Sequence, residues 1–192
     1  MKRLEKNVTL ITGGGKGIGF GLASAFAREG SDIVITGRTE SRLIEAKKKL
    51  EDQYGVEVLA VVADGADEAQ IKGVIAQTIT KFGKINTLIN NAQASSSGLP
   101  LIEHTKKDFD LAINSGLYAT FFYMREAYPY LKETRGSVIN FASGAGLFGN
   151  FGQCSYAAAK EGIRGLSRVA ATEWAKDGIN VTVTLTDEEI VE

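Results

Sequence analysis

The chain has little of what several classes of site require. Among its 192 residues are one cysteine and one histidine, which cannot form an internal disulfide or a usual protein-only zinc site, so we expect no metal. Its 22 basic residues balance 23 acidic ones, and this excludes a field that would gather nucleic acid. No apolar run approaches the roughly 20 residues that span a bilayer, and no secretory segment follows the charged start. We therefore expect a cytoplasmic protein without nucleic-acid or membrane partners.

Only two prolines interrupt the chain, and short β-rich runs alternate with longer helical stretches. This alternation is typical of repeated βαβ units with a parallel sheet. The predicted strands are Val8–Thr12, Asp32–Thr36, Val56–Ala63, Thr87–Asn90, Ser137–Ala142 and Asn180–Thr184. The predicted helices are Ile18–Glu29, Glu40–Tyr54, Glu68–Phe82, Lys106–Lys132 and Ser155–Lys176. No linker or repeat divides the chain, so residues 1–192 are predicted to form one domain.

A glycine-rich loop lies between the first predicted strand and the first predicted helix. Glycines in this context allow a tight turn and close approach to phosphates, which the helix N-terminus then binds. The context favours a Rossmann-type doubly wound sheet of six strands, with a seventh in a complete form, and with helices on both faces. The residues of this cofactor loop are Thr12, Gly13, Gly15, Lys16, Gly17, Ile18 and Gly19.

The end of the second strand predicts which dinucleotide binds, because ligands lie outside the carboxyl ends of parallel strands. A carboxylate there would bind the adenosine ribose of NAD, whereas this chain has Gly37 and then Arg38, which can pair with a 2′-phosphate. Lys16 adds a second positive charge, and Asp32 lies at the wrong end of the strand. The sequence favours NADP(H) over NAD(H), although a solvated Lys16 and an Arg38 that caps a surface turn would fit the same pattern.

Tyr156 and Lys160 stand four residues apart on a predicted helix, so both side chains lie on one face. A neighbouring ammonium favours the phenolate and makes a tyrosine a usable acid or base near neutral pH. Ser143 closes the fifth strand at the edge where the cofactor is expected. These three residues predict a proton-transfer site.

The spaced motifs together resemble those of the short-chain dehydrogenases/reductases over about residues 5 to 184. They are Thr12-Gly13-x-x-x-Gly17-x-Gly19, Asn90-Asn91-Ala92, Asn114, Ser143 and Tyr156-x-x-x-Lys160. The resemblance implies that Tyr156 is the general acid or base, that Ser143 binds the reacting oxygen, and that Lys160 also binds the nicotinamide ribose.

The same resemblance implies further roles. Asn114 would hold a water that relays protons, and Asn90 would steady the central sheet. Asp64, with Gly65 beside it, would contact adenine. Asn91 and Ala92 would line the cofactor.

The chain departs from this family at two places. Gln93 replaces the glycine of the usual Asn-Asn-Ala-Gly motif, and after residue 184 the family's Pro-Gly turn and substrate-covering segment do not follow. We therefore expect that the C-terminal portion is absent or altered. Two hypotheses remain open: an NADP(H)-dependent oxidoreductase acting on a small-molecule carbonyl or alcohol, and a cofactor-binding but catalytically impaired redox-sensing or scaffold protein.

Aromatic residues in the last two long helices have two interpretations. Phe121, Phe122, Tyr123 and Trp174 either belong to a homodimer or homotetramer surface or fill the core. Phe148 and Phe151 are candidates for an apolar substrate wall, and His104 is expected to be a surface residue without a partner.

Overall fold

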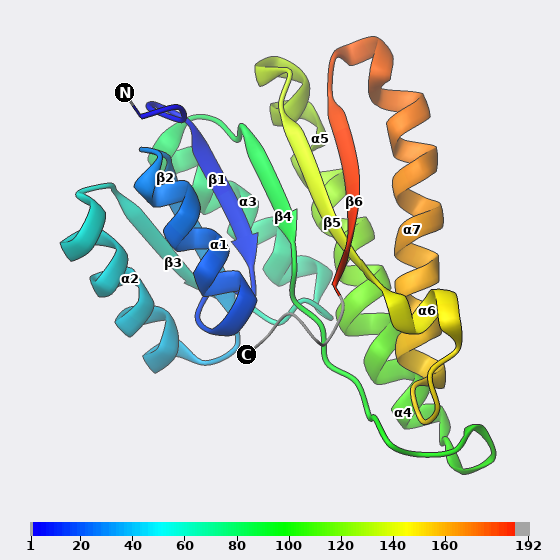
Figure 1. Cartoon of the computed structure of the whole chain (residues 1–192). Helices are drawn as coiled ribbons and strands as arrows, with labels where there is room; N and C mark the ends of the chain where they lie inside the picture. The colour runs from blue at the N-terminus through cyan, green and yellow to red at the C-terminus, as the bar shows by residue number, and fades with distance from the viewer. Residues whose placement is uncertain (1, 187–192) are drawn as a thin grey trace.

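The computed structural model describes residues 2–186, which form a six-stranded parallel sheet with helices on both faces (Figure 1). The strand order is β3-β2-β1-β4-β5-β6. The strands are β1 (Val8–Thr12), β2 (Asp32–Gly37), β3 (Val58–Val62), β4 (Thr87–Asn90), β5 (Ser137–Ser143) and β6 (Asn180–Thr186). The order reverses direction between β1 and β4, and such a switch point opens a crevice at the carboxyl ends of the strands. The predicted fold class is confirmed.

Two apolar layers hold the helices against the sheet. Successive β1 residues alternate between them, with Leu10 in one layer and Ile11 in the other. The layer around Ile11 is covered by α1 (Gly17–Arg28) and α2 (Glu40–Tyr54). The layer around Leu10 is covered by α3 (Glu68–Phe82), α5 (Ala119–Thr134) and α7 (Cys154–Trp174). Helices therefore cover both faces of the sheet around β1, which is the usual arrangement of a parallel sheet.

The predicted helix over 106–132 is interrupted by a π-helical turn. It consists of α4 (Lys106–Ala112), the π-helix η2 (Ile113–Tyr118) and α5. Ser115 in η2 accepts a hydrogen bond from the Ala94 amide at 3.0 Å and donates to the Ala94 carbonyl at 2.9 Å. This clasp fixes the segment after β4 to the wide turn, and π-helical turns often occur at functional sites.

Three short elements were not predicted. The 3₁₀ turns η1 (Leu101–Glu103) and η3 (Ala175–Asp177) flank longer helices, and α6 (Gly144–Phe148) follows β5 directly. The third strand is shorter than the expected Val56–Ala63. No helix among the described residues is long and apolar enough to cross a membrane.

The aromatic residues with two interpretations divide between core and surface. Tyr123 is buried, and Phe122 and Trp174 pack against the core layer around Leu10. Phe121 is 38% exposed and lies on the outer side of α5, beside Phe122. Core packing therefore accounts for three of the four residues, and only Phe121 remains available to a surface contact.

Candidate active site

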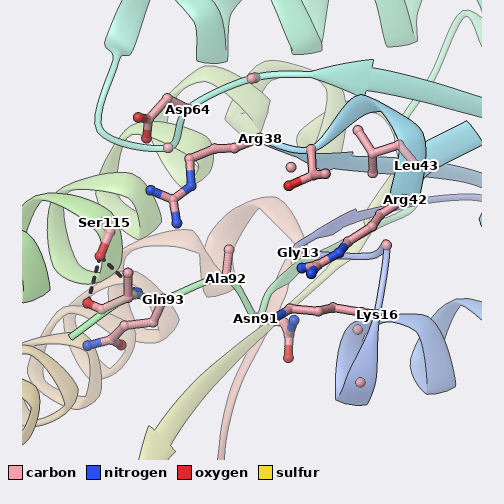
Figure 2. Close-up of a pocket in the computed structure, with 18 of the residues that line it drawn as sticks. Gly13, Lys16, Arg38, Arg42, Leu43, Asp64, Asn91, Ala92, Gln93 and Ser115 are labelled. Atoms are coloured by element: carbon pink, nitrogen blue, oxygen red, sulfur yellow. Dashed lines mark hydrogen bonds between the residues drawn. The ribbon is translucent and has the colours of Figure 1, made fainter. Parts of the chain in front are cut away.

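A cavity of about 500 Å³ lies at the switch point, within the range of cofactor pockets (Figure 2). Its lining comes from the loop after β1, the end of β2, the start of α2, and the segments after β3 and β4. The predicted cofactor residues in this lining are Gly13, Gly15, Lys16, Gly17, Ile18, Gly19, Arg38, Asp64, Gly65, Asn91 and Ala92. The sequence therefore located most of the cavity wall.

The glycine loop leaves little room for side chains, as Gly13 and Gly19 illustrate. A Cβ on Gly19 would lie 2.3 Å from the Gly13 carbonyl oxygen, a distance that real structures do not show. Gly13 has a φ of 70°, in the left-handed region, and a Cβ there would lie 3.0 Å from the Asn91 amide nitrogen. The backbone consequently forms a close cradle at the N-terminus of α1, where free N–H groups and the helix dipole favour an anion.

Thr12 does not line the cavity but holds two of its walls together. Its hydroxyl oxygen accepts hydrogen bonds from the amides of Asn91 at 3.0 Å and Ala92 at 2.9 Å. The Asn91 side chain donates in return to the Thr12 carbonyl at 3.0 Å. Thr12 thus joins the ends of β1 and β4 at the edge of the cavity.

Three cationic side chains border the cavity. Lys16 lies in the glycine loop, Arg38 follows β2, and Arg42 lies in the first turn of α2. Among residues 2–186 none of the three side chains has an ion pair or a hydrogen bond, although many surface cations of this chain do. Gly37 places no carboxylate between them. This part of the cavity suits an anionic group. A dinucleotide with a 2′-phosphate carries several negatively charged phosphate groups.

Arg42 was missed by the sequence analysis. It lies four residues after Arg38, across the turn that begins α2, and the fold brings both side chains to one cavity (Figure 2). The sequence offered one indication of its role, because Arg42 falls in the first turn of a predicted helix. A positive charge there is unfavourable to the helix dipole, so it does not stabilise the helix locally.

The four candidate catalytic residues are not among the residues that line this cavity. Ser143 ends β5, Tyr156 and Lys160 lie on α7, and Asn114 lies in η2. Both β5 and η2 pack against α7, so the four residues come from α7 and from two elements that contact it. Within the described residues, no hydrogen bond joins Tyr156 to Ser143.

Lys160 is buried beneath Tyr156. Its amine lies 5.4 Å from the centre of the Tyr156 ring and donates a hydrogen bond of 2.8 Å to the Phe141 carbonyl of β5. Burial lowers the pKa of Lys160 to about 8, because leaving water disfavours the ammonium. The amine is thus fixed in place and can exchange a proton near neutral pH.

Ser143 is buried and caps α6 with its hydroxyl oxygen, which accepts from the Ala145 amide at 3.2 Å. The hydroxyl hydrogen remains for a second partner.

A buried amide chain braces the two elements that carry these residues. Asn90 of β4 donates to Asn140 of β5 at 2.8 Å, and Asn140 donates to the Ser167 hydroxyl of α7 at 2.9 Å. Ser167 in turn donates to the Ile163 carbonyl at 2.7 Å. These hydrogen bonds agree with the expectation that Asn90 steadies the central sheet. They also connect the sheet to α7 through Ser167.

His104 was expected to lack a partner, and this is wrong. Its ring lies 3.3 Å from the Ser155 hydroxyl and 3.4 Å from the Pro100 carbonyl, measured from the ring nitrogens. Ser155 is buried and precedes Tyr156 directly. His104 therefore connects the segment after β4 to the first turn of α7.

Comparisons with known proteins agree with this geometry. The sequence model described as "short chain dehydrogenase" matches residues 7–186. The chain belongs to the short chain dehydrogenase family. A 12alpha-hydroxysteroid dehydrogenase from a Clostridium species is 64% identical over 185 residues, which are 93% of this chain and 71% of that protein.

Similar solved structures carry either cofactor. An NAD⁺-bound xylitol dehydrogenase matches with a TM-score of 0.91 and 27% identity, over 95% of this chain and 70% of that one. An L-sorbose reductase from Gluconobacter frateurii, solved with NADPH and L-sorbose, has the same TM-score at 29% identity and the same coverage. Members of the family use NAD(P)(H), and the neighbours leave the choice between the two open.

Proposed function

We propose that this short chain dehydrogenase transfers a hydride between NADP(H) and an alcohol or carbonyl group of a hydroxysteroid, with Tyr156 as the general acid or base. The observation that carries the proposal is the placement of Lys160 directly beneath the Tyr156 ring, on the helix that packs against the end of β5. The 64% identical hydroxysteroid dehydrogenase supports the substrate class.

The preference for NADP(H) rests on charge. Lys16, Arg38 and Arg42 all line the cavity, and Gly37 offers no acceptor to a free ribose hydroxyl. Arginine pairs well with phosphate because its planar donors match the oxygens. A 2′-phosphate adds negative charge to the dinucleotide.

The side chains of α7 and β5 divide the handling of the proton. When bound, the nicotinamide supplies or accepts the hydride. In reduction, Tyr156 donates its phenolic proton to the carbonyl oxygen as hydride reaches the carbonyl carbon, and in oxidation the phenolate takes the alcohol proton. Ser143 donates a hydrogen bond to the same oxygen. Lys160 favours the phenolate and, with a water held by Asn114, restores the proton from solvent.

Apolar side chains near this cluster suit a large hydrocarbon skeleton. Phe148 ends α6 and is 79% exposed, and Phe151 follows it with 82% exposed. The Gly98 amide donates to the Gly152 carbonyl at 2.8 Å, which ties this loop to the segment after β4. Burying such rings against a steroid would contribute favourable transfer free energy.

We further propose a cytoplasmic homodimer or homotetramer. Tyr118 and Phe121 are exposed at the start of α5, and Tyr118 stacks on Phe122. A second copy would cover these rings. The alternative of a catalytically impaired redox-sensing or scaffold protein is not favoured, because the relatives with matching sequence are named oxidoreductases.

The test is the turnover of a 12α-hydroxysteroid with NADP⁺, followed by the absorbance of the reduced cofactor. We expect Tyr156→Phe to lower kcat about 10²-fold to 10⁴-fold, which is the usual effect of removing a general acid or base. Tyr54→Phe, which removes a phenol at the end of α2 and outside the cavity lining, is the matched control and should leave kcat unchanged. A Tyr156→Phe protein as fast as the parent would refute the mechanism, and no turnover of any hydroxysteroid would refute the substrate class.

A further inference from the structure

Gln93 lies where the family usually has glycine, and its side chain rests on the π-helical turn η2. A Cβ on Gly116 would lie 2.7 Å from the Gln93 Cδ, 2.8 Å from its Oε1 and 3.0 Å from its Nε2. These similar distances mean that the flat face of the carboxamide covers the glycine. The hydrogen-bonding edge of the amide therefore points along the surface of η2 and not into its backbone.

Both polar atoms of this carboxamide are buried without a hydrogen-bond partner in the described part of the chain. A buried amide that makes no hydrogen bond costs the desolvation free energy of its polar groups. Native proteins satisfy nearly all such groups, and exceptions concentrate at functional sites. Gln93 thus has a donor group and an acceptor that no residue of the described part of the chain satisfies.

The position of Gln93 indicates which part of a ligand it meets. Gln93 and Ser115 lie on one side of the cofactor cavity, and Lys16 and Arg42 lie on the opposite side (Figure 2). Lys16 and Arg42 border the glycine loop and so mark the phosphate end of the cavity. The Gln93 side adjoins η2, which carries Asn114 and packs against α7, the helix of Tyr156. Gln93 therefore borders the nicotinamide half of the site.

We infer that the Gln93 carboxamide binds the nicotinamide ribose half of the cofactor, and that Gly116 is the glycine that makes room for it. The inference rests on the proposed use of NADP(H). Ribose hydroxyls both donate and accept, which matches an amide. The last side-chain torsion of glutamine is soft, so the amide can turn its edge into the cavity at little cost.

Two ligands separate the halves of the cavity: NADPH, and 2′,5′-ADP, which is the adenosine half alone. Binding of each to the 192-residue chain is measured by calorimetric titration. Gln93→Leu keeps the bulk and removes the hydrogen bonds, so we expect NADPH to bind about fivefold to tenfold more weakly. Binding of 2′,5′-ADP should stay within about twofold of the parent value, since that ligand does not reach Gln93.

A second pair of variants tests the role of Gly116. Gly116→Ala places a methyl group where the carboxamide lies, so it should weaken NADPH binding to a similar degree. In the Gln93→Gly background the same change should have no further effect, because the clashing atoms are gone. Gln93→Gly also replaces the leucine variant if thermal unfolding shows that the latter does not fold.

The inference is overturned if Gln93→Leu leaves NADPH binding unchanged, or if it weakens both ligands equally. Failure of the cofactor proposal has a different signature: the parent chain would then bind neither NADPH nor 2′,5′-ADP, and the inference would fall with it. If the parent chain binds NADH more tightly than NADPH, only the proposed preference for a 2′-phosphate fails. The same comparison is then made with NADH and AMP.

Discussion

The side-chain nitrogen of Lys160 lies 5.4 Å from the centre of the Tyr156 ring, one helical turn away on α7. Two effects act on this amine in opposite directions. Burial disfavours the ammonium and lowers its pKa to about 8, while the Phe141 carbonyl accepts a hydrogen bond from it. The result is an amine close to half-protonated in mildly alkaline solution, beside the phenol that we propose as the general acid or base.

The lowered pKa of Lys160 makes stability depend on pH. The pKa falls from 10.5 to about 8 on folding, so between these values the unfolded chain binds more protons than the folded one. The contribution of Lys160 to the free energy of unfolding therefore rises with pH across this window, by about 3 kcal/mol in full. Denaturant unfolding below the window and near its upper end should show this rise, and Lys160→Met should lack it.

Lys48→Met is the matched control, because Lys48 is an exposed lysine on α2. It should keep the pH dependence of the parent, so that the difference between the two variants isolates Lys160. If Lys160→Met and the parent changed in parallel over the window, the buried amine would not have a lowered pKa.

Two glycines of α1 give opposite predictions for the same substitution. Gly19→Ala puts a Cβ 2.3 Å from the Gly13 carbonyl oxygen, so the cradle must open, and binding of NADPH should fall at least tenfold with a loss of stability. A Cβ on Gly21 meets nothing within 4 Å, and alanine is the better helix former. Gly21→Ala should therefore leave binding intact and raise stability by about 0.5–1 kcal/mol. Thermal unfolding and cofactor titration of both variants test this, and equal effects would contradict the cradle geometry.

The sequence predicted the sheet and the cofactor loop because their signals are local. Short apolar runs such as the one that contains Leu10 and Ile11 alternate along the chain with helices whose apolar residues recur regularly. The glycines lie between the first strand and the first helix. The π-helical turn at Ser115 was not predictable, since its hydrogen bonds reach Ala94, which is 21 residues away in sequence. The sequence shows that Arg42 and Gln93 are present, but it does not show that both line one cavity. Only the fold determines which side chains converge.

The buried amide chain should couple the sheet to α7. Asn140 is completely buried, and Asn140→Leu would remove the acceptor of the Asn90 side-chain amide and the donor to the Ser167 hydroxyl oxygen. We expect a loss of about 2–4 kcal/mol in the free energy of unfolding, because unpaired buried groups carry their full desolvation cost. Thr172→Ala, which removes an exposed hydroxyl from the same helix, should cost less than about 0.5 kcal/mol. A mild effect of Asn140→Leu in urea unfolding would mean that the chain of amides does not brace α7.

The cations that line the cavity predict how the two dinucleotides respond to mutation. If Arg38 and Arg42 bind the 2′-phosphate, each alanine variant should weaken NADPH about tenfold to 100-fold, since a hydrogen bond to a charged group contributes about 1.5–3 kcal/mol. NADH has no 2′-phosphate, so its binding should change little, and the preference for NADPH should shrink by the same factor.

Raising the salt concentration should weaken the binding of NADPH more than that of NADH in the parent, because exposed charges are screened. The difference between the two dinucleotides should be smaller in the variants. Lys48→Ala, which removes a cation of α2 outside the cavity lining, controls for net charge. Equal losses for NADPH and NADH in Arg42→Ala would place that arginine on the diphosphate instead, and tighter NADH binding by the parent would reverse the cofactor preference altogether.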